Sequence, residues 1–304
     1  MHSNHFYKTI KAIAWVTGGT ALFSLIFASG KFADGSASAL QILFLRYIGG
    51  LATLLLVVAV RRERLSAYRS PKPYSHFTRA VFGASGGGAL IYASANMPIM
   101  DATAIGLLYV VFVIPLGVMV LKERLSGQHV GAIAICCAGA TILMASRGAF
   151  TEFHLVYVFP ACIAVIGAAL LAVEGLMIKV LSHSDRAMTV LLYVNTFGIL
   201  LMAVPAAIQW VPLTLEGAMP FVLLGPVAVT AQYCIVQGYR LASLSIVGPV
   251  DYTWLIFAGL IGFVFFGEQP TLGVVAGAAM ITIGGIILAV IKSPSSARED
   301  TSSV

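Results

Sequence analysis

Residues 92–123 read YASANMPIMDATAIGLLYVVFVIPLGVMVLKE, and residues 237–268 read QGYRLASLSIVGPVDYTWLIFAGLIGFVFFGE. The two stretches align without a gap at a shift of 145 positions, with small residues in similar places. Both end on a glutamate, Glu123 in the first and Glu268 in the second. Two such similar segments in one chain predict an internal repeat.

A second agreement extends the repeat toward the N-terminus. At a shift of 148 positions, Lys31 corresponds to Lys179 and Tyr47 corresponds to Asn195. Internal repeats of membrane-embedded units are typical of secondary transporters, whose substrate site lies between the repeats. The pattern therefore favours a transporter before any single residue is considered.

The composition places the chain in a membrane. Hydrophobic residues make up 59% of the 304 residues and charged residues 10%, whereas a soluble domain carries about 25% charged residues. A membrane-spanning helix needs roughly 20 apolar residues, and the backbone in lipid must satisfy its own hydrogen bonds. The predicted fold is an all-α membrane protein with ten transmembrane helices, at 12–30, 40–60, 80–98, 102–121, 128–146, 154–178, 187–209, 219–239, 245–266 and 272–291.

The distribution of positive charge predicts the orientation. Of the 18 Lys and Arg residues, all but Arg46, Lys31 and Arg147 fall on the side of the membrane that holds the two termini. By the positive-inside rule, both termini are cytoplasmic, in a bacterial inner membrane. The residues on this side are Lys8, Lys11, Arg61, Arg62, Arg64, Arg69, Lys72, Arg79, Lys122, Arg124, Lys179, Arg186, Arg240, Lys292 and Arg298.

The repeat must then be inverted. Each repeat holds five spans, and because five is odd, the second copy crosses the membrane in the opposite sense to the first. The first repeat, with helices 1–5, is predicted at 12–146, and the second, with helices 6–10, at 154–291. Residues 292–304 form a cytoplasmic tail.

These segments resemble a known family. The stretch LLYVVFVIPLGVMVLKERLSGQHVGAIAI (107–135) resembles the first EamA repeat, and YRLASLSIVGPVDYTWLIFAGLIGFVFFGEQPTLGVVAGAAMI (239–281) resembles the second. The likeness covers about residues 12–291, and the "KE" and "GE" endings are fairly specific to it. One departure is Lys122, where the first repeat more often has glycine. The chain is thus similar to ten-helix members of the EamA family, within the drug/metabolite transporter superfamily.

The resemblance implies a secondary transporter or exchanger of small organic molecules, with a central cavity. Members of the family transport amino acids, vitamins, S-adenosylmethionine, nucleotide-like metabolites and drugs. Membership therefore leaves the substrate open, and an amino acid, a vitamin or an S-adenosylmethionine-like metabolite is expected here.

Three ionisable residues fall inside predicted spans, where charge is costly and usually faces the bundle interior. Arg46 either binds substrate or is a snorkelling or paired cation. Glu174, five residues before Lys179, either forms a structural ion pair there or takes part in proton coupling. Asp251 follows Gly248–Pro249, where an irregular helix is expected, and is a candidate for substrate binding and for proton coupling.

Neutral polar and aromatic residues inside the spans are expected to line a cavity. Tyr109 and Trp254 occupy corresponding positions of the two repeats, and such aromatic pairs suit ring-bearing substrates by stacking or cation–π contact. The alternative is an aromatic residue at the lipid interface. The predicted substrate-binding set is Arg46, Tyr92, Asn96, Tyr109, Asn195, Gln232, Tyr233, Gln237, Asp251 and Trp254.

Enzyme signatures are absent from the sequence. It has no GxxxxGK[ST] phosphate loop, no HExxH and no GxSxG elbow, so no catalytic residue, metal or cofactor is expected. The expected partners are a small-molecule substrate and the lipid bilayer, without nucleic acid. GxxxG spacings at Gly127–Gly131 and Gly273–Gly277 serve helix packing or homodimerisation, so a monomer and a homodimer both stay open. The alternative function is a non-transporting membrane scaffold or an intramembrane accessory protein.

Overall fold

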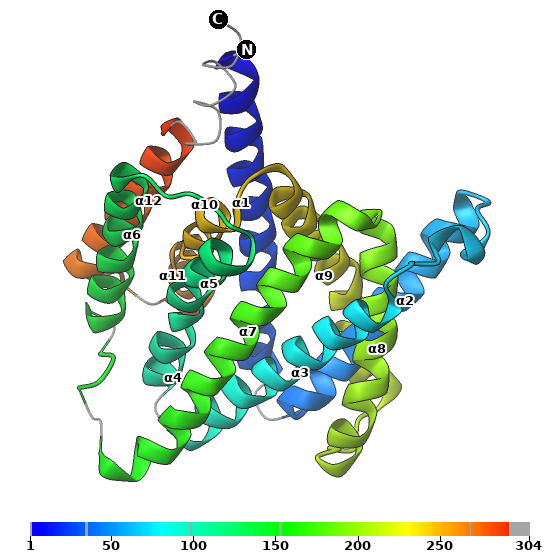
Figure 1. The fold of residues 1–304 in the computed structure, drawn as a ribbon. Coiled ribbons are helices and arrows are strands. Elements are labelled where there is room, and N and C mark those ends of the chain that lie inside the picture. Colours follow the sequence, from blue (N-terminus) through cyan, green and yellow to red (C-terminus); the bar gives the residue numbers. More distant parts are fainter. Residues whose placement is uncertain are drawn as a thin grey trace, which may run out of the picture.

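The computed structural model describes residues 2–33, 36–97, 99–146, 148–151, 154–267 and 269–291, and every regular element in them is a helix (Figure 1). The α-helices are α1 (His2–Ala33), α2 (Ala39–Val60), α3 (Pro73–Asn96), α4 (Ile99–Gly106), α5 (Leu108–Val120), α6 (Gly127–Ser146), α7 (Val158–Ser184), α8 (Ala187–Ile208), α9 (Leu215–Leu241), α10 (Leu244–Val250), α11 (Thr253–Phe266) and α12 (Leu272–Val290). Two short 3₁₀ helices, η1 (Leu65–Tyr68) and η2 (Leu155–Tyr157), precede α3 and α7.

Eight segments of the described chain are long and apolar enough to cross a membrane. They correspond to α1, α2, α4 with α5, α6, α7, α8, α9, and α10 with α11. Helix α3 carries glycines and polar residues, and the apolar part of α12, Leu272–Leu288, is shorter than the others. The structure thus confirms an all-helical membrane protein.

Two of the predicted spans are broken helices. The span predicted at 102–121 is divided between α4 and α5 at Leu107, and the span predicted at 245–266 is divided between α10 and α11. At the second break, the amides of Asp251 and Tyr252 donate to the carbonyls of Gly248 and Pro249, three residues back. These are tight 3₁₀-type bonds, and the break between α4 and α5 has the same kind of bond, from the amide of Val110 to the carbonyl of Leu107.

The helix bounds reproduce the repeat seen in the sequence. Helix α8 matches α2 at a shift of 148 at both ends, and α10 and α11 begin 145 positions after α4 and α5. The packing repeats as well: α1 lies against α9 as α3 lies against α7, and α2 packs on α9 as α8 packs on α3. In Figure 1, α1 runs downward from the N-terminus while α7 runs upward, so the first helices of the two repeats are antiparallel.

Glycines allow the closest helix crossings. A Cβ atom at Gly225 of α9 would lie 2.2 Å from the carbonyl carbon of Gly49 in α2, and one at Gly277 of α12 would lie 2.6 Å from the carbonyl oxygen of Gly139 in α6. The predicted packing function therefore holds for Gly277. A Cβ atom at Gly127 or Gly131 would have no atom of the described residues within 4 Å, so these two glycines face outward from the bundle.

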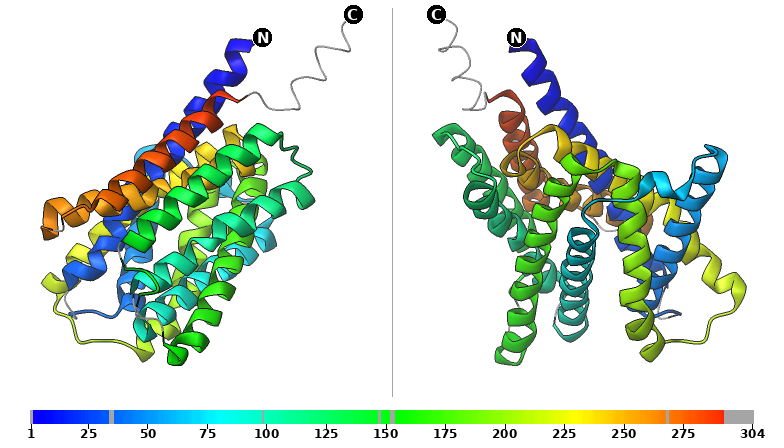
Figure 2. Two further views of the ribbon diagram at one scale, coloured as in Figure 1. Left: turned by 90° about the vertical axis from the view of Figure 1, so that its left-hand side faces the viewer. Right: turned by 45° about the vertical axis from the view of Figure 1, so that its right-hand side comes forward.

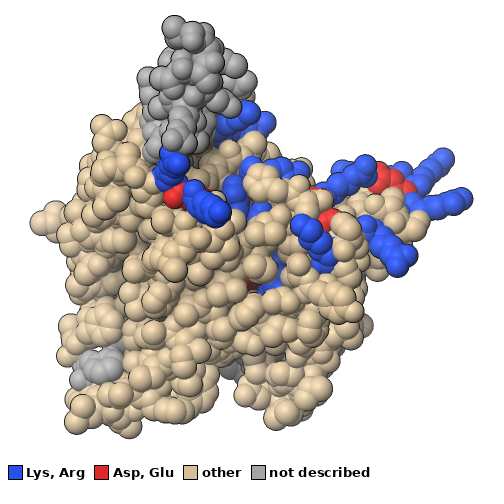
Figure 3. Space-filling model, in the orientation of Figure 1, with Lys and Arg blue, Asp and Glu red and all other residues tan. Residues whose placement is uncertain are grey.

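Positive charge gathers at one end of the molecule. Lys and Arg side chains cluster on the side where α1 begins and where the α2–α3 connection projects (Figure 3). We call this side, which holds the connections 61–72, 121–126 and 185–186, the basic face. In Figure 2, right, the ribbons of α7 and α3 diverge from those of α8 and α9 toward the opposite face.

Candidate functional site

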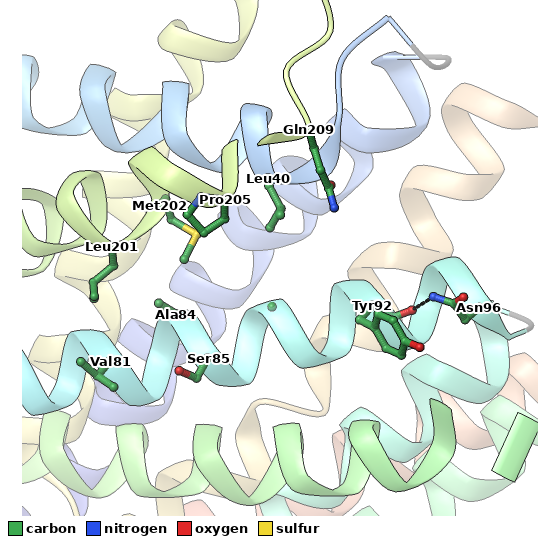
Figure 4. Close-up of a pocket in the computed structure, with 11 residues that line it drawn as sticks. Leu40, Val81, Ala84, Ser85, Tyr92, Asn96, Leu201, Met202, Pro205 and Gln209 are labelled. Carbon is green, nitrogen blue, oxygen red and sulfur yellow. Dashed lines mark hydrogen bonds between the residues drawn. The ribbon is translucent and has the colours of Figure 1, made fainter. Parts of the chain in front are cut away.

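A cavity of about 580 Å³ lies between α2, α3 and α8 (Figure 4). Helix α3 contributes one face of residues spaced three or four apart, which is the spacing of a single helical face. The walls of the cavity are largely apolar. The lining residues are Val81, Ala84, Ser85, Gly88, Tyr92 and Asn96 from α3, Leu201, Met202, Pro205 and Gln209 from α8, and Leu40 from α2.

Tyr92 and Asn96 are the two residues of the predicted set that line this cavity. They come from the last turns of α3, at the end remote from the basic face, and the Asn96 amide donates to the Tyr92 carbonyl at 2.8 Å (Figure 4). The Tyr92 ring meets Phe159 edge-on at 6.4 Å and stays 43% exposed. Tyr92 and Asn96 therefore supply polar atoms at the end of the cavity that is remote from the basic face.

A buried charge cluster lies beside the cavity, nearer the basic face. Arg46 of α2 places its guanidinium 4.6 Å from the centroid of the Tyr47 ring. Arg79 of α3 places Nε 3.7 Å from Oε1 of Glu174 of α7. Arg46 also interacts electrostatically with Glu174, so the three charged groups form one cluster. We refer to Arg46, Arg79 and Glu174 as the charge cluster.

The structure corrects two sequence-based predictions here. The charge count includes Arg79 among the residues on the side of the two termini, but its side chain is 2% exposed and lies inside the bundle, so it adds nothing to the charge of that surface. The sequence suggests Lys179 as the partner of Glu174, but the partner is Arg79, because residues five apart on a helix do not face each other. Gly83, one turn after Arg79, leaves room for Glu174, because a Cβ atom there would be 2.6 Å from the Glu174 carboxyl carbon.

Asp251 lies at the helix break, where its carboxylate accepts hydrogen bonds from two tyrosines. Tyr109 donates to Oδ2 in a short hydrogen bond, and Tyr239 donates to the same atom at 3.2 Å. Tyr109 belongs to the predicted set, whereas Tyr239 does not. Trp254 lies in the first turn of α11, and its carbonyl oxygen accepts a hydrogen bond from the Ser24 hydroxyl of α1 at 3.4 Å.

The remaining predicted residues are distributed elsewhere. Asn195 is buried and donates to the carbonyl of Leu191 at 2.8 Å within its own helix. Gln237 donates to the Tyr233 hydroxyl at 2.7 Å, and the Tyr233 ring packs edge-on against Trp15. The Gln232 Oε1 atom is buried without a hydrogen-bond partner among the described residues. The predicted set thus divides between the cavity, the charge cluster and the Asp251 break, while Asn195 lies in α8 and Gln232, Tyr233 and Gln237 lie in α9.

Two charged side chains cap helix ends at the basic face, and the first of them, Glu123, joins the two repeats. Glu123, just after α5, accepts from the Leu244 amide at 2.5 Å, the Ser245 amide at 2.9 Å and the Ser245 hydroxyl at 2.6 Å. It therefore caps the N-terminus of α10, where backbone amides lack helical partners and the dipole favours an anion. Lys179 of α7 caps the end of α9 by donating to the carbonyls of Tyr239, at 2.6 Å, and Ala242.

The repeat partners of these two residues are not described in the same detail. Glu268 corresponds to Glu123 and lies outside the described residues, and so does Arg147. Lys31 corresponds to Lys179 and lies in α1, but its side chain is outside the described part of the structure. The two caps are therefore established for the basic face.

A further network fastens the basic face. Asp185, between α7 and α8, accepts from Ser70 at 2.8 Å and lies 3.0 Å from His76 Nε2, while Arg240 donates to its carbonyl at 2.7 Å. Nearby, Tyr68 donates to Glu63, and this hydrogen bond raises the pKa of Tyr68 above its ordinary value. These contacts tie the α2–α3 connection to the turn between α7 and α8 at the basic face.

The chain is similar to known membrane transporters along most of its length. The family model of the EamA-like transporter family matches the chain twice, at residues 10–145 and 158–290. The chain belongs to the EamA-like transporter family. It is 28% identical over 293 residues to a riboflavin transporter of Rhizobium johnstonii, covering 92% of this chain and 91% of that protein.

Two further likenesses agree with this membership. The chain is 26% identical over 270 residues to the pseudopaline exporter CntI of Pseudomonas aeruginosa, covering 88% of this chain and 91% of the exporter. A solved crystal structure shares the fold with a TM-score of 0.75 at 19% identity, covering 95% of this chain and 98% of that one. The family and these relatives point to a small-molecule transporter rather than an enzyme.

Proposed function

We propose that this EamA-family transporter is a secondary transporter that moves a small organic metabolite by alternating access between two inverted repeats. The observation that carries the proposal is the asymmetry of the bundle. A cavity lies between α2, α3 and α8, while Glu123 of the first repeat bonds to Leu244 and Ser245 of the second at the basic face. Alternating access requires such a state, closed on one side while a central site stays accessible from the other.

The proposed membrane arrangement has ten spans. In addition to the eight apolar segments, α3 and α12 would cross the membrane, with the polar residues of α3 turned toward the cavity and the charge cluster. The basic face would be cytoplasmic, with both termini and the tail 292–304 on that side, in the inner membrane. Residues 12–146 and 154–291 would be the two units that rock against each other.

The proposed coupling group is Asp251. Its carboxylate lies at the break between α10 and α11 and accepts from Tyr109 and Tyr239, which belong to different repeats. A change in its protonation would alter both contacts at once and would thus act on the seam between the repeats. Glu174 is the second candidate, because its ion pair with Arg79 joins α7 to α3.

The substrate class proposed from the relatives and from the cavity is an amino acid, a vitamin or an S-adenosylmethionine-like metabolite. The cavity volume falls within the range of about 300–1,000 Å³ that is common for small-molecule sites. Its apolar walls, with Tyr92 and Asn96 at one end, suit an amphipathic solute better than a large polyanion.

Uptake into proteoliposomes tests this function. Purified protein would be reconstituted, and uptake of labelled amino acids, S-adenosylmethionine and riboflavin would be measured with and without a pH gradient. Saturable uptake is expected for one compound, and it should be blocked by the cavity-filling substitution Ser85→Trp. The control Leu200→Trp places the same bulk on an α8 residue that is 65% exposed, and it should transport normally. Failure of a broad metabolite panel with folded protein would reject transport in favour of a scaffold.

A further inference from the structure

The charge cluster has more positive than negative charge. It contains the guanidinium groups of Arg46 and Arg79 and the single carboxylate of Glu174, and both arginines are buried, at 7% and 2% exposed. An unbalanced charge inside a membrane protein is costly, and such residues normally face a partner or a wet cavity. The described residues supply only one of the two anions that the arginines require.

Part of the hydrogen-bonding capacity of the arginines is also unused. Arg79 Nε and Nη1 and Arg46 Nε are buried without a hydrogen-bond partner among the described residues. The 3.7 Å separation between Arg79 Nε and Glu174 Oε1 is an ion pair, but it exceeds the usual length of a hydrogen bond. Several guanidinium donors are therefore free to bind oxygen atoms that the protein does not provide.

The repeat argues against a purely structural purpose for these charges. The two halves share the same helices and the same helix contacts, so a charge required for packing would be expected in both. The residues at the corresponding positions of the other repeat are all apolar: Val194 for Arg46, Leu224 for Arg79 and Ile26 for Glu174. The scaffold packs with aliphatic side chains at these positions, so only one of the two equivalent contacts between the repeats carries the charges.

The cluster adjoins the cavity. Tyr47, whose ring lies under the Arg46 guanidinium, packs in one buried group with Ala84 and Met202, which both line the cavity. Figure 4 shows Ala84 and Met202 facing each other from α3 and α8. On the other side of the same turn of α3, Gly83 lies against the Glu174 carboxyl group, which keeps 21% of its side-chain surface.

We propose that Arg46 and Arg79 bind the carboxylate of the transported solute, and that the substrate of the transport function proposed above is therefore an organic acid. Guanidinium groups bind carboxylates and phosphates through paired, charge-assisted hydrogen bonds. The cluster lacks one negative charge, which a single carboxylate supplies, whereas a phosphate monoester carries about −1.5 to −2 at pH 7. The apolar body of the acid would lie along the walls formed by α3 and α8.

A binding assay that does not require transport tests the assignment. The thermal stability of purified full-length protein in detergent would be followed with amino acids, monocarboxylic acids and dicarboxylic acids, each compared with its amide, and with matched phosphate monoesters. At least one carboxylate should raise the unfolding temperature in a saturable way, while its amide has no effect. Stabilisation by phosphate monoesters alone, by the amides equally, or by no carboxylate would overturn the proposal.

Variants designed from the repeat keep the packing intact. Arg46→Val, and Arg79→Leu combined with Glu174→Ile, place the residues of the other repeat in the cluster, so folding is protected. Each should weaken the apparent affinity for the acid by about tenfold or more. The control Arg186→Gln, at an exposed arginine on the basic face, should bind as the parent does. Unchanged affinity in both cluster variants would reject the site.

The outcome separates this site from the transport function. Arginine-dependent binding of an acid without uptake into proteoliposomes would keep the site and reject transport. Uptake of a neutral solute such as riboflavin that persists in Arg46→Val would keep transport and reject the carboxylate assignment.

Discussion

Removing the carboxylate of Glu123 should shift the transporter away from the state seen here. The side chain of Glu123, which follows α5 of the first repeat, accepts three hydrogen bonds from Leu244 and Ser245, which begin α10 of the second. These contacts cross the seam between the repeats at the basic face. Under alternating access, opening this face would break them, so they would stabilise one state of the transporter only.

The magnitude follows from the geometry. A hydrogen bond to a charged group contributes about 1.5–3 kcal/mol, and an anion at a helix N-terminus adds about 0.3–1 kcal/mol. Because one carboxylate accepts all three bonds, their contributions are not additive, and we take about 3 kcal/mol for the set. A change of 1.4 kcal/mol is tenfold, so Glu123→Ala should shift the equilibrium between the two states by roughly 100-fold. Glu123→Gln keeps one acceptor oxygen and should have an intermediate effect.

Cysteine labelling measures this shift. Ser85 lines the cavity, so Ser85→Cys in a cysteine-free background reports access from the opposite face when an impermeant maleimide is added outside cells. Labelling should slow by at least about tenfold in Glu123→Ala and by less in Glu123→Gln. The control Glu216→Ala removes an exposed glutamate from the first turn of α9 and should label at the parental rate. Equal rates for folded Glu123→Ala and its parent would refute the closing role of these bonds.

Three further predictions concern stability and coupling. Gly225→Ala should lower the stability of the detergent-solubilised protein by about 1–3 kcal/mol, because its Cβ would lie 2.2 Å from the Gly49 carbonyl carbon; Gly18→Ala, with nothing within 4 Å among the described residues, is the control for thermal unfolding. Asp251→Asn should abolish the response of uptake to a pH gradient while the protein still folds, and an unchanged pH profile would remove Asp251 from the coupling mechanism. Tyr68→Phe should cost about 1 kcal/mol at pH 7 by loss of the bond to Glu63. Since this bond raises the pKa of Tyr68, its contribution is present below pH 10 and is lost as the pH rises through the raised pKa, so the gap between parent and variant in chemical unfolding should close above that pH.

Much of the fold could be predicted from the sequence. The apolar segments, their repeat and the irregular helix expected at Gly248–Pro249 follow from local properties of the chain. The structure breaks the helix just after Pro249, between Val250 and Thr253. The sequence did not separate α4 from α5 at Leu107, because the segment stays apolar through the break. The predicted ten-span arrangement and its orientation remain proposals.

The candidate site was less predictable for a physical reason. Which residues are costly in a membrane follows from their chemistry alone, so Arg46, Glu174 and Asp251 could be singled out from the sequence. Their partners depend on helix crossings between segments far apart in the chain. Arg79 meets Glu174 across 95 positions because α3 packs against α7.

The sequence by itself determined that this protein is a helical membrane transporter with an internal repeat, because hydrophobicity and repeat spacing need no knowledge of contacts. Tertiary structure alone decided that Tyr239 and Tyr109 bind Asp251, that Glu123 and Lys179 cap helix ends at the basic face, and that Arg79 pairs with Glu174. The sequence shows which charged residues lie in apolar segments, whereas the packing of the helices determines which residues they contact.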